Sequence, residues 1–474
     1  MARWLRRLVQ AAAALWLLWI VGANAWLNSG LTGVPLISVR DAEVRAGRAF
    51  SWWPGKVSGR GLRVVVHDSN VEMELNVGEF DLTLSLLSAV HKQLRTTHAR
   101  LSGVSLRLRK TRFLDALCAR AGLPPIAGQA DPPIAGRDCL AQKETAHPKG
   151  PPPNPEDLFH LQLDGLEARD VGEVWIEGVR LLGDVALEGS WLFWPKREME
   201  IHLHDLAVHG ASLAMGPLQL AAKVDVALIG DLARLPLDRV EAKDFWRAVT
   251  ARISMDLGSL QLRTIREALM SADPIAPPRL PGMEGLAMVQ SESRLEQGHV
   301  REFSLAVRAQ DAGLKLLDRR LDGALRLGVH MAEDPQHPGR LLFTRSGLAI
   351  AGPRLDGQRF DDVEITLDAL GTSHLDPEKQ RADLDFSAHV SKVRFLVALI
   401  PGGLPQSVAK LLLDGSDPAV AAGALHATGK DAEVSDFHAQ AGSLHLDGGF
   451  RFAPALDGKL TAKYGPISVD VPLK

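Results

Sequence analysis

The sequence predicts a mainly β protein built on one long, curled antiparallel sheet, with a few short helices and an N-terminal transmembrane helix. Three observations lead to this prediction. Apolar and polar residues alternate along many segments, as they do in strands with one apolar face. Leu-Asp-Gly recurs six times, and Asp-Gly supplies the positive φ of tight strand reversals. A long apolar run stands near the N-terminus.

The N-terminal run, residues 8–27, is long enough to cross a hydrocarbon layer of roughly 30 Å. A basic flank before it predicts that the N-terminus stays in the cytoplasm and that the chain after residue 30 is exported. Tryptophans within it are typical of anchoring at a membrane interface. The expected anchor residues are Arg3, Arg6, Arg7, Trp16, Trp19 and Trp26.

A cleaved signal peptide is the competing interpretation of the same segment. Ala23-Asn24-Ala25 fits a small-residue cleavage pattern, and residues 8–21 have the length of a signal-peptide apolar region. Both interpretations export the body of the chain.

Residues 51–84 illustrate the strand pattern. Val71, Met73, Leu75 and Val77 fall on one side of an extended chain, whereas the polar residues between them, among them Glu74, fall on the other. We therefore expect a charge reversal at Glu74 to leave the apolar face unchanged. Residues 190–220 repeat several landmarks of this segment in the same order, including Ser-Trp, Trp-Pro and His-Asp.

Similar alternation continues to the end of the chain and predicts successive antiparallel strands. Apolar residues at helical spacing predict short helices at 84–94, 112–122, 244–253, 264–270 and 405–413. Prolines and glycines crowd 124–155, where proline blocks both strand and helix hydrogen bonding. We expect four parts: an anchor (1–30), an N-terminal β unit (31–123), a linker or loop (124–155) and a repetitive β body (156–474).

The two cysteines, Cys118 and Cys139, enclose a Pro- and Gly-rich excursion that packing alone would hold weakly. A disulfide closing a loop of this length would contribute on the order of 3 kcal/mol, and an oxidising compartment would permit it. We expect this disulfide, with two unrelated thiols as the alternative.

Composition and motifs argue against several classes of function. The formal net charge is only −3 and aromatic residues make up 5 %, so nucleic acid is not an expected partner. His202 and His204 share a strand face but have no further ligands at useful spacing, and no nucleophile elbow or phosphate loop occurs. We expect neither an enzyme nor a metal or cofactor.

Strands with one apolar face must cover that face. A sandwich, a closed barrel, or a curled sheet whose groove is filled by lipid or protein would each do so. For a groove, the expected lining residues are Val71, Met73, Leu75, Val77, Val104, Leu106, Leu108, Met199, Ile201 and Leu203. Basic residues after Leu106, among them Arg107, could meet anionic headgroups, or form an ordinary charged strand face.

The anchor, the strand entry "WWPGKVSGRGLRV", the Leu-rich helix and the returning strands "TTHARLSGVSLRLRK" together resemble the start of the AsmA family. These are membrane-anchored envelope proteins related to TamB and to chorein-type lipid conduits. The resemblance is best over residues 1–110. It implies a β-groove, a single pass through the bacterial inner membrane with the bulk of the chain in the periplasm, and a role in lipid transport or outer-membrane biogenesis.

The expected function is therefore that of an anchored, exported β-groove protein that handles phospholipid, with membrane lipids and other envelope proteins as partners. Two alternatives remain. The strands could pack as dry sandwiches in a structural or protein-interaction role, or cleavage could release a secreted binding domain. The sequence gives no indication of the oligomeric state.

Overall fold

The computed structural model divides into two compact units, residues 1–219 with 223–250, and residues 220–222 with 251–474. The described residues are 2–29, 36–39, 42–67, 71–85, 87–88, 93–110, 160–176, 179–194, 198–215, 218–236, 247–265, 283–316, 319–377, 379, 381–399, 418–428, 431–451 and 457–473. The predicted disulfide of Cys118 and Cys139 and the segment 124–155 lie outside these residues. So do the expected helices at 112–122 and 405–413.

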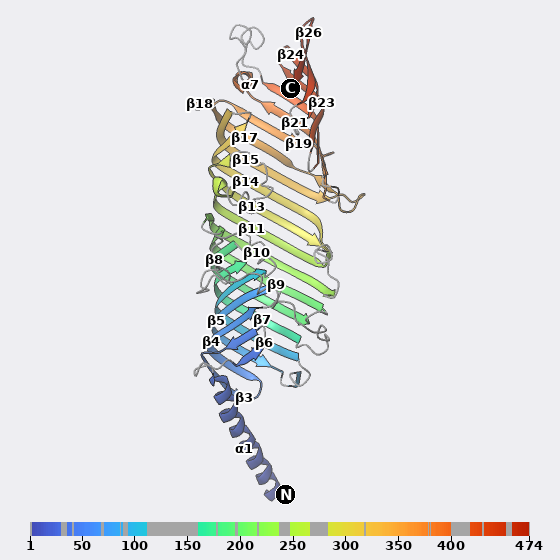
Figure 1. Ribbon diagram of the computed structural model, residues 1–474. Helices are drawn as coiled ribbons and strands as arrows, with labels where there is room; N and C mark the ends of the chain where they lie inside the picture. The colour runs from blue at the N-terminus through green and yellow to red at the C-terminus, as the bar shows by residue number, and fades with distance from the viewer. Residues whose placement is uncertain are drawn as a thin grey trace, which may run out of the picture. The chain divides into compact units, whose positions relative to one another are not determined.

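The first unit consists of one long helix and a sheet whose main strands follow one another in chain order (Figure 1). The elements are α1 (Ala2–Leu27), β1 (Ile37–Val39), β2 (Ala42–Arg45), β3 (Arg48–Trp53), β4 (Lys56–His67), β5 (Val71–Leu84), β6 (Gln93–Lys110), β7 (His160–Ile176), β8 (Val179–Trp194), β9 (Glu198–Met215) and β10 (Leu218–Pro236). Strands β2 and β3 both pair with β4, at different points along it.

Most pairs in this unit are antiparallel, but β6 and β7 run parallel, with Gln93 opposite His160 and Leu108 opposite Ile176. A parallel connection must return to the starting end of the sheet and so needs a long crossover. The 49 residues between Lys110 and His160 supply it. This pair departs from the all-antiparallel order that alternation alone predicts, because alternation carries no information on strand direction.

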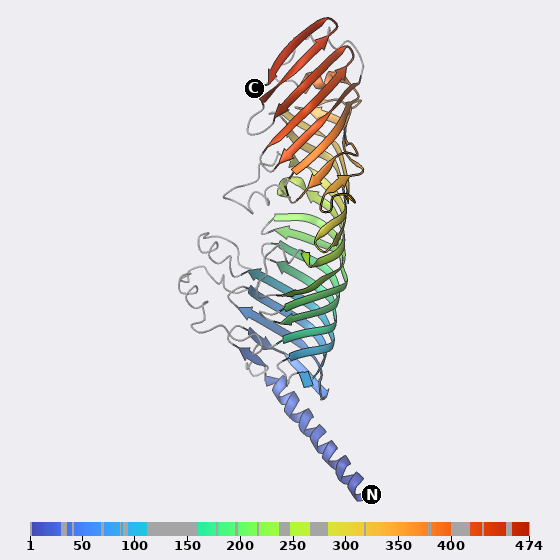
Figure 2. The same cartoon turned by 90° about the vertical axis from the view of Figure 1, so that its right-hand side faces the viewer.

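Each long strand bends near its middle, where one residue often has a positive φ. The values are +70° at Gly61 in β4, +64° at Gly103 in β6, +52° at Asp170 in β7 and +58° at Gly210 in β9. The register places Gly61, Gly78, Gly103 and Asp170 opposite one another across four strands. The kinks therefore line up as one crease across the sheet, and Figure 2 shows the strands of this unit curving along their length.

Burial shows toward which side the sheet folds. At the crease, two buried residues flank two exposed ones, as in Val77-Gly78-Glu79-Phe80 and Val208-His209-Gly210-Ala211. In a regular strand residues i and i+3 point to opposite sides, so the kink brings both onto the same side. Because these apolar residues are buried, the sheet folds toward its apolar face.

The second unit repeats this design with further antiparallel strands. Its main strands pair successively: β11 (Val249–Gln261), β13 (Leu286–Glu296), β14 (His299–Leu316), β15 (Arg319–Glu333), β17 (Ser346–Leu355), β19 (Glu364–Ala369), β21 (Arg381–Val390), β22 (Ala419–Thr428), β23 (Ala432–Ala441), β24 (Leu444–Arg451), β25 (Asp457–Tyr464) and β26 (Ile467–Leu473). Short strands pair beside them: β12 (Met283–Glu284), β16 (Leu341–Phe343), β18 (Gln358–Arg359) and β20 (His374–Asp376).

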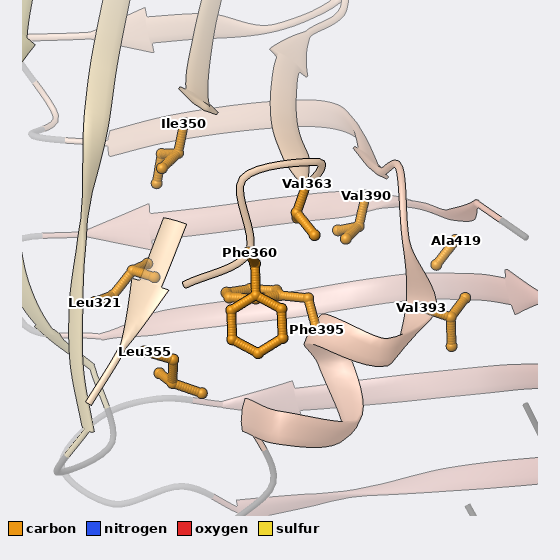
Figure 3. Close-up of a cluster of buried hydrophobic side chains, with 9 residues drawn as sticks. All are labelled: Leu321, Ile350, Leu355, Phe360, Val363, Val390, Val393, Phe395 and Ala419. Atoms are coloured by element: carbon orange, nitrogen blue, oxygen red, sulfur yellow. The ribbon is translucent and has the colours of Figure 1, made fainter. Parts of the chain in front are cut away.

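A short helix, α7 (Val393–Leu399), covers part of the apolar face in the second unit (Figure 3). Phe395 of α7 is fully buried and meets Phe360 edge to face, with ring centroids 5.3 Å apart. Around this pair lies a buried cluster from the loops and strands: Leu321, Ile350, Leu355, Val363, Val390, Val393 and Ala419. Here the face forms a dry core.

The predicted fold class is confirmed: the chain is mainly β, with few short helices and an apolar N-terminal helix. Among the helix predictions, 244–253 is wrong in its described part, because β11 begins at Val249. Its residues alternate Ala251, Ile253, Met255 and Leu257, a period of two that fits the sheet.

Candidate functional site: the apolar face of the first unit

Three rows of apolar side chains cross six neighbouring strands, β4 to β9, on one side of the crease. In each row, every residue lies directly opposite the next across a strand pair. The crease row is Leu62, Val77, Val104, Val171, Val185 and Val208. The middle row is Val64, Leu75, Leu106, Val174, Leu181 and Leu213. The rim row is Met73, Leu108, Ile176, Val179 and Met215; on β4 the residue opposite Met73 is Val66, whose side chain lies outside the described residues. We call these rows the first wall.

Exposure rises from the crease to the rim of the first wall. The crease valines from Val77 to Val208 are only 2–6 % exposed. The middle row is half-buried throughout. In the rim row Ile176 and Val179 are 47 % and 40 % exposed. Among the described residues of this unit, no helix covers the wall as α7 covers part of the second unit.

A second wall continues beyond the crease, again in register across strands. One of its rows is Leu84, Thr96, Leu163, Trp191 and Ile201, and another is Leu94, Leu161, Phe193 and Met199. Trp191 and Phe193 also contact each other, with ring centroids 6.0 Å apart. The two walls and the crease form one apolar face because the kinks keep apolar residues on one side.

The structure places the predicted lining residues on both walls. Met73, Leu75, Val77, Val104, Leu106 and Leu108 lie together on the first wall. Val71 continues this strand, and its side chain lies outside the described residues. Met199, Ile201 and Leu203 lie on the second wall, at the other end of the folded strands. The nine residues whose side chains are described thus share one face of the sheet but lie in two separate patches.

The opposite face of the first wall carries a packed charge cluster. Glu74, expected on the side opposite the apolar residues, is 5 % exposed and accepts a hydrogen bond from Arg63 Nε at 3.1 Å. Arg107 lies 3.8 Å from Glu74 and donates to Glu173 at 2.9 Å. Glu74 thus lies opposite the apolar face, as expected, but dense ionic packing buries its carboxylate, and reversing its charge would place a third cation beside two arginines.

Arg107 and its neighbours also seal the parallel β6–β7 junction. Strand β6 supplies donors and β7 supplies acceptors along its length: Gln93 to Gln162, Arg95 to Asp164, Arg100 to Glu167, Ser102 to Asp170, and Ser105 and Arg107 to Glu173. Burial alone would raise the pKa of Glu173, but hydrogen bonds from Arg107 and Arg180 more than offset it and lower the pKa. Arg107 is thus occupied by carboxylates of its own chain.

Helix α1 displays the predicted anchor. Its residues 6–27 are long and apolar enough to cross a membrane. Leu8, Val9, Leu15, Leu18 and Val21 are all more than half exposed. Exposed apolar side chains around a helix call for an apolar surrounding. Trp16, Trp19 and Asn24 make hydrogen bonds to β3, which ties α1 to the sheet.

His202 and His204 are not brought together with other metal ligands. His202 lies between two carboxylates, with Nδ1 2.8 Å from Asp231 and Nε2 3.0 Å from Glu200. The hydrogen bond to Asp231 is the main cause that raises the pKa of His202. Within the described part of the chain, no group of three or more metal-ligating side chains occurs.

One arrangement in the second unit has the order of a catalytic relay. His426 Nδ1 lies 2.6 Å from Asp383, and its Nε2 lies 3.3 Å from Ser435 Oγ. Asp383 is also bound by Arg381 and His374. The adjacent cavity of about 450 Å³ is lined by Asp383 and His374 but not by His426 or Ser435. The ion pairs of Asp383 with His374, Arg381 and His426 join neighbouring strands of the sheet.

Sequence reasoning missed the crease and most of the second wall. The signal is a change in the parity of apolar positions: Val71 to Val77 occupy odd positions, whereas Phe80, Leu82 and Leu84 occupy even ones, with Gly78 between. The same change occurs around Gly103 in β6 and Gly210 in β9. Where apolar residues switch between odd and even positions at a glycine, the strand kinks, and the apolar residues before and after the kink stay on the same side of the sheet.

No protein-family model, curated protein or solved structure matches this chain significantly. The functional argument therefore rests on the geometry of the chain itself.

Proposed function

We propose that the protein is a membrane-anchored lipid carrier of the bacterial envelope, which holds acyl chains against the apolar face of its exported sheet. The single observation that carries the proposal is the first wall, where three apolar rows cross six strands and become more exposed away from the crease. The expected resemblance to AsmA-type envelope proteins agrees with this role.

The energetic reason is the cost of exposing acyl chains to water. Moving one CH₂ group out of water is favourable by about 0.8 kcal/mol. Transfer of a whole acyl chain of typical length from the membrane into water therefore costs on the order of 10 kcal/mol. A carrier must offset most of that cost with apolar contact. A continuous face of Val, Leu, Ile and Met supplies contact without directional bonds, which suits a cargo that slides.

The opposite face supports the same asymmetry. Its charges are paired with each other, as in Arg107 with Glu173 and Arg100 with Glu167. Paired charges keep that face wetted and leave acyl chains no favourable contact there. Lipid would therefore be restricted to one face of the sheet.

The contacts of α1 favour an uncleaved anchor over a released domain. Cleavage after Ala25 would remove Trp16, Trp19 and Asn24, which hydrogen-bond to Ser51 and Trp52 of β3. Ser51 is fully buried, and the loss would remove the Asn24 partner of its N–H and carbonyl. We expect Trp26 not to be the mature N-terminus.

The proposal is tested by photo-crosslinking at two adjacent residues of β9. Leu213 lies in the middle row of the first wall, and Ala214 lies opposite Arg180 on the charged face. A benzophenone amino acid at position 213, irradiated in intact cells, is expected to form a lipid adduct detectable by mass spectrometry. The same amino acid at position 214 should form none. Adducts at neither position, or equally at both, would contradict a lipid-binding face.

Charge substitution at the same pair separates an open wall from a dry core. Leu213→Asp places a carboxylate on the apolar face, where losing its hydration costs several kcal/mol unless water enters. On an open wall the variant is expected to fold and to co-purify with less lipid, while Ala214→Asp, beside Arg180, keeps the native amount. Unfolding by Leu213→Asp alone would instead favour a dry structural or interaction protein.

A further inference from the structure

The turn between β3 and β4 lies alongside the middle of α1 rather than at its end. Trp16 Nε1 donates a hydrogen bond to the carbonyl of Trp52 at 3.0 Å. Trp53 and Pro54 share a mostly apolar cavity of about 670 Å³ with the helix, whose lining reaches Val9. The turn therefore runs back along α1 toward its N-terminus.

Asn24 of α1 and Asn28, which directly follows the helix, pair with the outer edge of β3 as a neighbouring strand would. Asn24 donates to the carbonyl of Ser51 at 2.9 Å and accepts from its N–H at 2.7 Å. Asn28 makes the same two bonds with Ala49, at 2.6 and 3.2 Å. Four helical residues rise about 6 Å and two strand residues about 6.6 Å, so the spacings match.

This pairing meets the main requirement for placing a strand edge in hydrocarbon. Unpaired backbone groups are excluded from the bilayer core because each costs several kcal/mol there. On β3, the outward backbone groups of Ser51 and Ala49 are bonded to Asn24 of α1 and to Asn28 just after it. Trp19 Nε1 also donates to Ser51 Oγ at 3.1 Å. An aqueous strand edge would not need such complete pairing, since water could satisfy it.

The depth follows from the helix itself. Trp16 precedes the end of α1 at Leu27 by eleven residues, which is about 16 Å at 1.5 Å per residue. The candidate span 6–27 has 22 residues, or about 33 Å, close to one hydrocarbon thickness. A turn bonded to Trp16 would therefore lie near the middle of the layer that α1 crosses.

The side chains of the turn suit that depth. Phe50, Trp52 and Trp53 are 52–56 % exposed, and Pro54 follows them. Lys56 is the one charged residue of the turn, and its long side chain can reach toward the headgroups. The turn also adjoins the second wall, because Leu84 N–H donates to the carbonyl of Gly55 at 2.6 Å.

We propose that the β3–β4 turn, residues 52–56, is inserted among the acyl chains of the membrane that α1 crosses. The proposal rests on the anchor of the proposed function but not on lipid carriage by the sheet. It means that the folded sheet begins inside the hydrocarbon layer. Lipid chains entering the apolar face would then move from one apolar surrounding to another without crossing water.

The test measures the depth of three positions in the full-length protein, reconstituted in phosphatidylcholine–phosphatidylglycerol vesicles. A small fluorescent amino acid is placed at Trp53 in the turn, at Ala12 in α1, or at Glu188, an exposed residue of β8. Quenching is recorded with lipids brominated midway along their acyl chains, and separately with aqueous iodide. Positions 53 and 12 are expected to lose fluorescence to bromine and resist iodide, whereas position 188 should behave in the opposite way.

Each other outcome identifies which idea fails. Iodide quenching at position 53 together with bromine quenching at position 12 would overturn the inserted turn and leave the anchor intact. Iodide quenching at both positions would remove the anchor as well. A double variant, Asn24→Leu with Asn28→Leu, keeps α1 apolar but unpairs β3. In this double variant, position 53 is expected to become accessible to iodide, whereas position 12 is expected to stay protected. Unchanged bromine quenching at position 53 would show that insertion of the turn does not depend on the two asparagines.

Discussion

At the scale of single residues, the decisive feature is the kink within each strand. Asp170, Ser259 and Asp436 adopt positive φ without being glycine, at +52°, +56° and +48°. Asp tolerates this region better than most residues because its short polar side chain can bond locally. The side chain of Asp170 also accepts a hydrogen bond across the strand pair, from Ser102 Oγ at 3.1 Å. The kinks convert an alternating strand into two wall segments that share one apolar side.

Replacing a kink glycine tests this role. Gly103→Ala adds a Cβ at φ +64°, where neighbouring atoms leave room, so the expected loss of about 1–2 kcal/mol in unfolding free energy comes from backbone strain. Asp170→Gly removes the strain but also the bond from Ser102, so it should change stability by less than about 1 kcal/mol. Chemical denaturation in mild detergent measures both. An equal, negligible effect of the two substitutions would mean that the kinks are not under conformational constraint.

At the scale of elements, one alternating pattern supports two kinds of packing. In the first unit the middle and rim rows are left open among the described residues, whereas α7 seals part of the apolar face in the second unit. The strand sequences do not distinguish these outcomes. What decides is whether another segment of the chain folds back on the face, and the seven residues of α7 are too few for helical periodicity to identify them.

The sealed region should respond to truncation as a core does. Phe395→Ala deletes a fully buried ring that packs against Phe360, so the expected loss is about 3–5 kcal/mol in unfolding free energy. Leu367→Ala is the matched control: Leu367 lies in β19, four residues after Val363 of the cluster, is 39 % exposed, and its truncation should cost roughly 1 kcal/mol. Amide hydrogen exchange of strands β17 to β22 measures how much each substitution lowers the local stability around the cluster. Equal protection in both variants would show that α7 does not seal a core.

At the scale of the whole molecule, the chain separates its chemistry in space. The apolar anchor stands at the N-terminus after a basic flank, and the sheet strands that follow carry paired charges on one face and aliphatic side chains on the other. The proposed carrier would require this separation, since its anchor would fix the sheet at the membrane and its apolar face would receive the acyl chains.

Topology gives the broadest test of that arrangement. A reporter that is active only outside the cytoplasm, fused after Lys474, is expected to be active, because Arg3, Arg6 and Arg7 retain the N-terminus inside. The protein should also require detergent for extraction. Moving the three arginines to positions after residue 27 is the control and should reduce export. Activity of a cytoplasm-only reporter at Lys474 would refute the exported body.

The sequence by itself determined the mainly β class, the apolar helix and the apolar identity of the residues lining the face. Those features are local, because a period of two and an uncharged run of 20 residues each dictate a structure without reference to distant parts of the chain. The tertiary structure alone decided the parallel β6–β7 junction, the burial of Glu74, the division of the lining residues between two walls, and the pairing of Asn24 and Asn28 with β3. Each of these depends on which segments become neighbours. Strand direction, register and docking are set by contacts between residues far apart in the chain, and no local pattern encodes them.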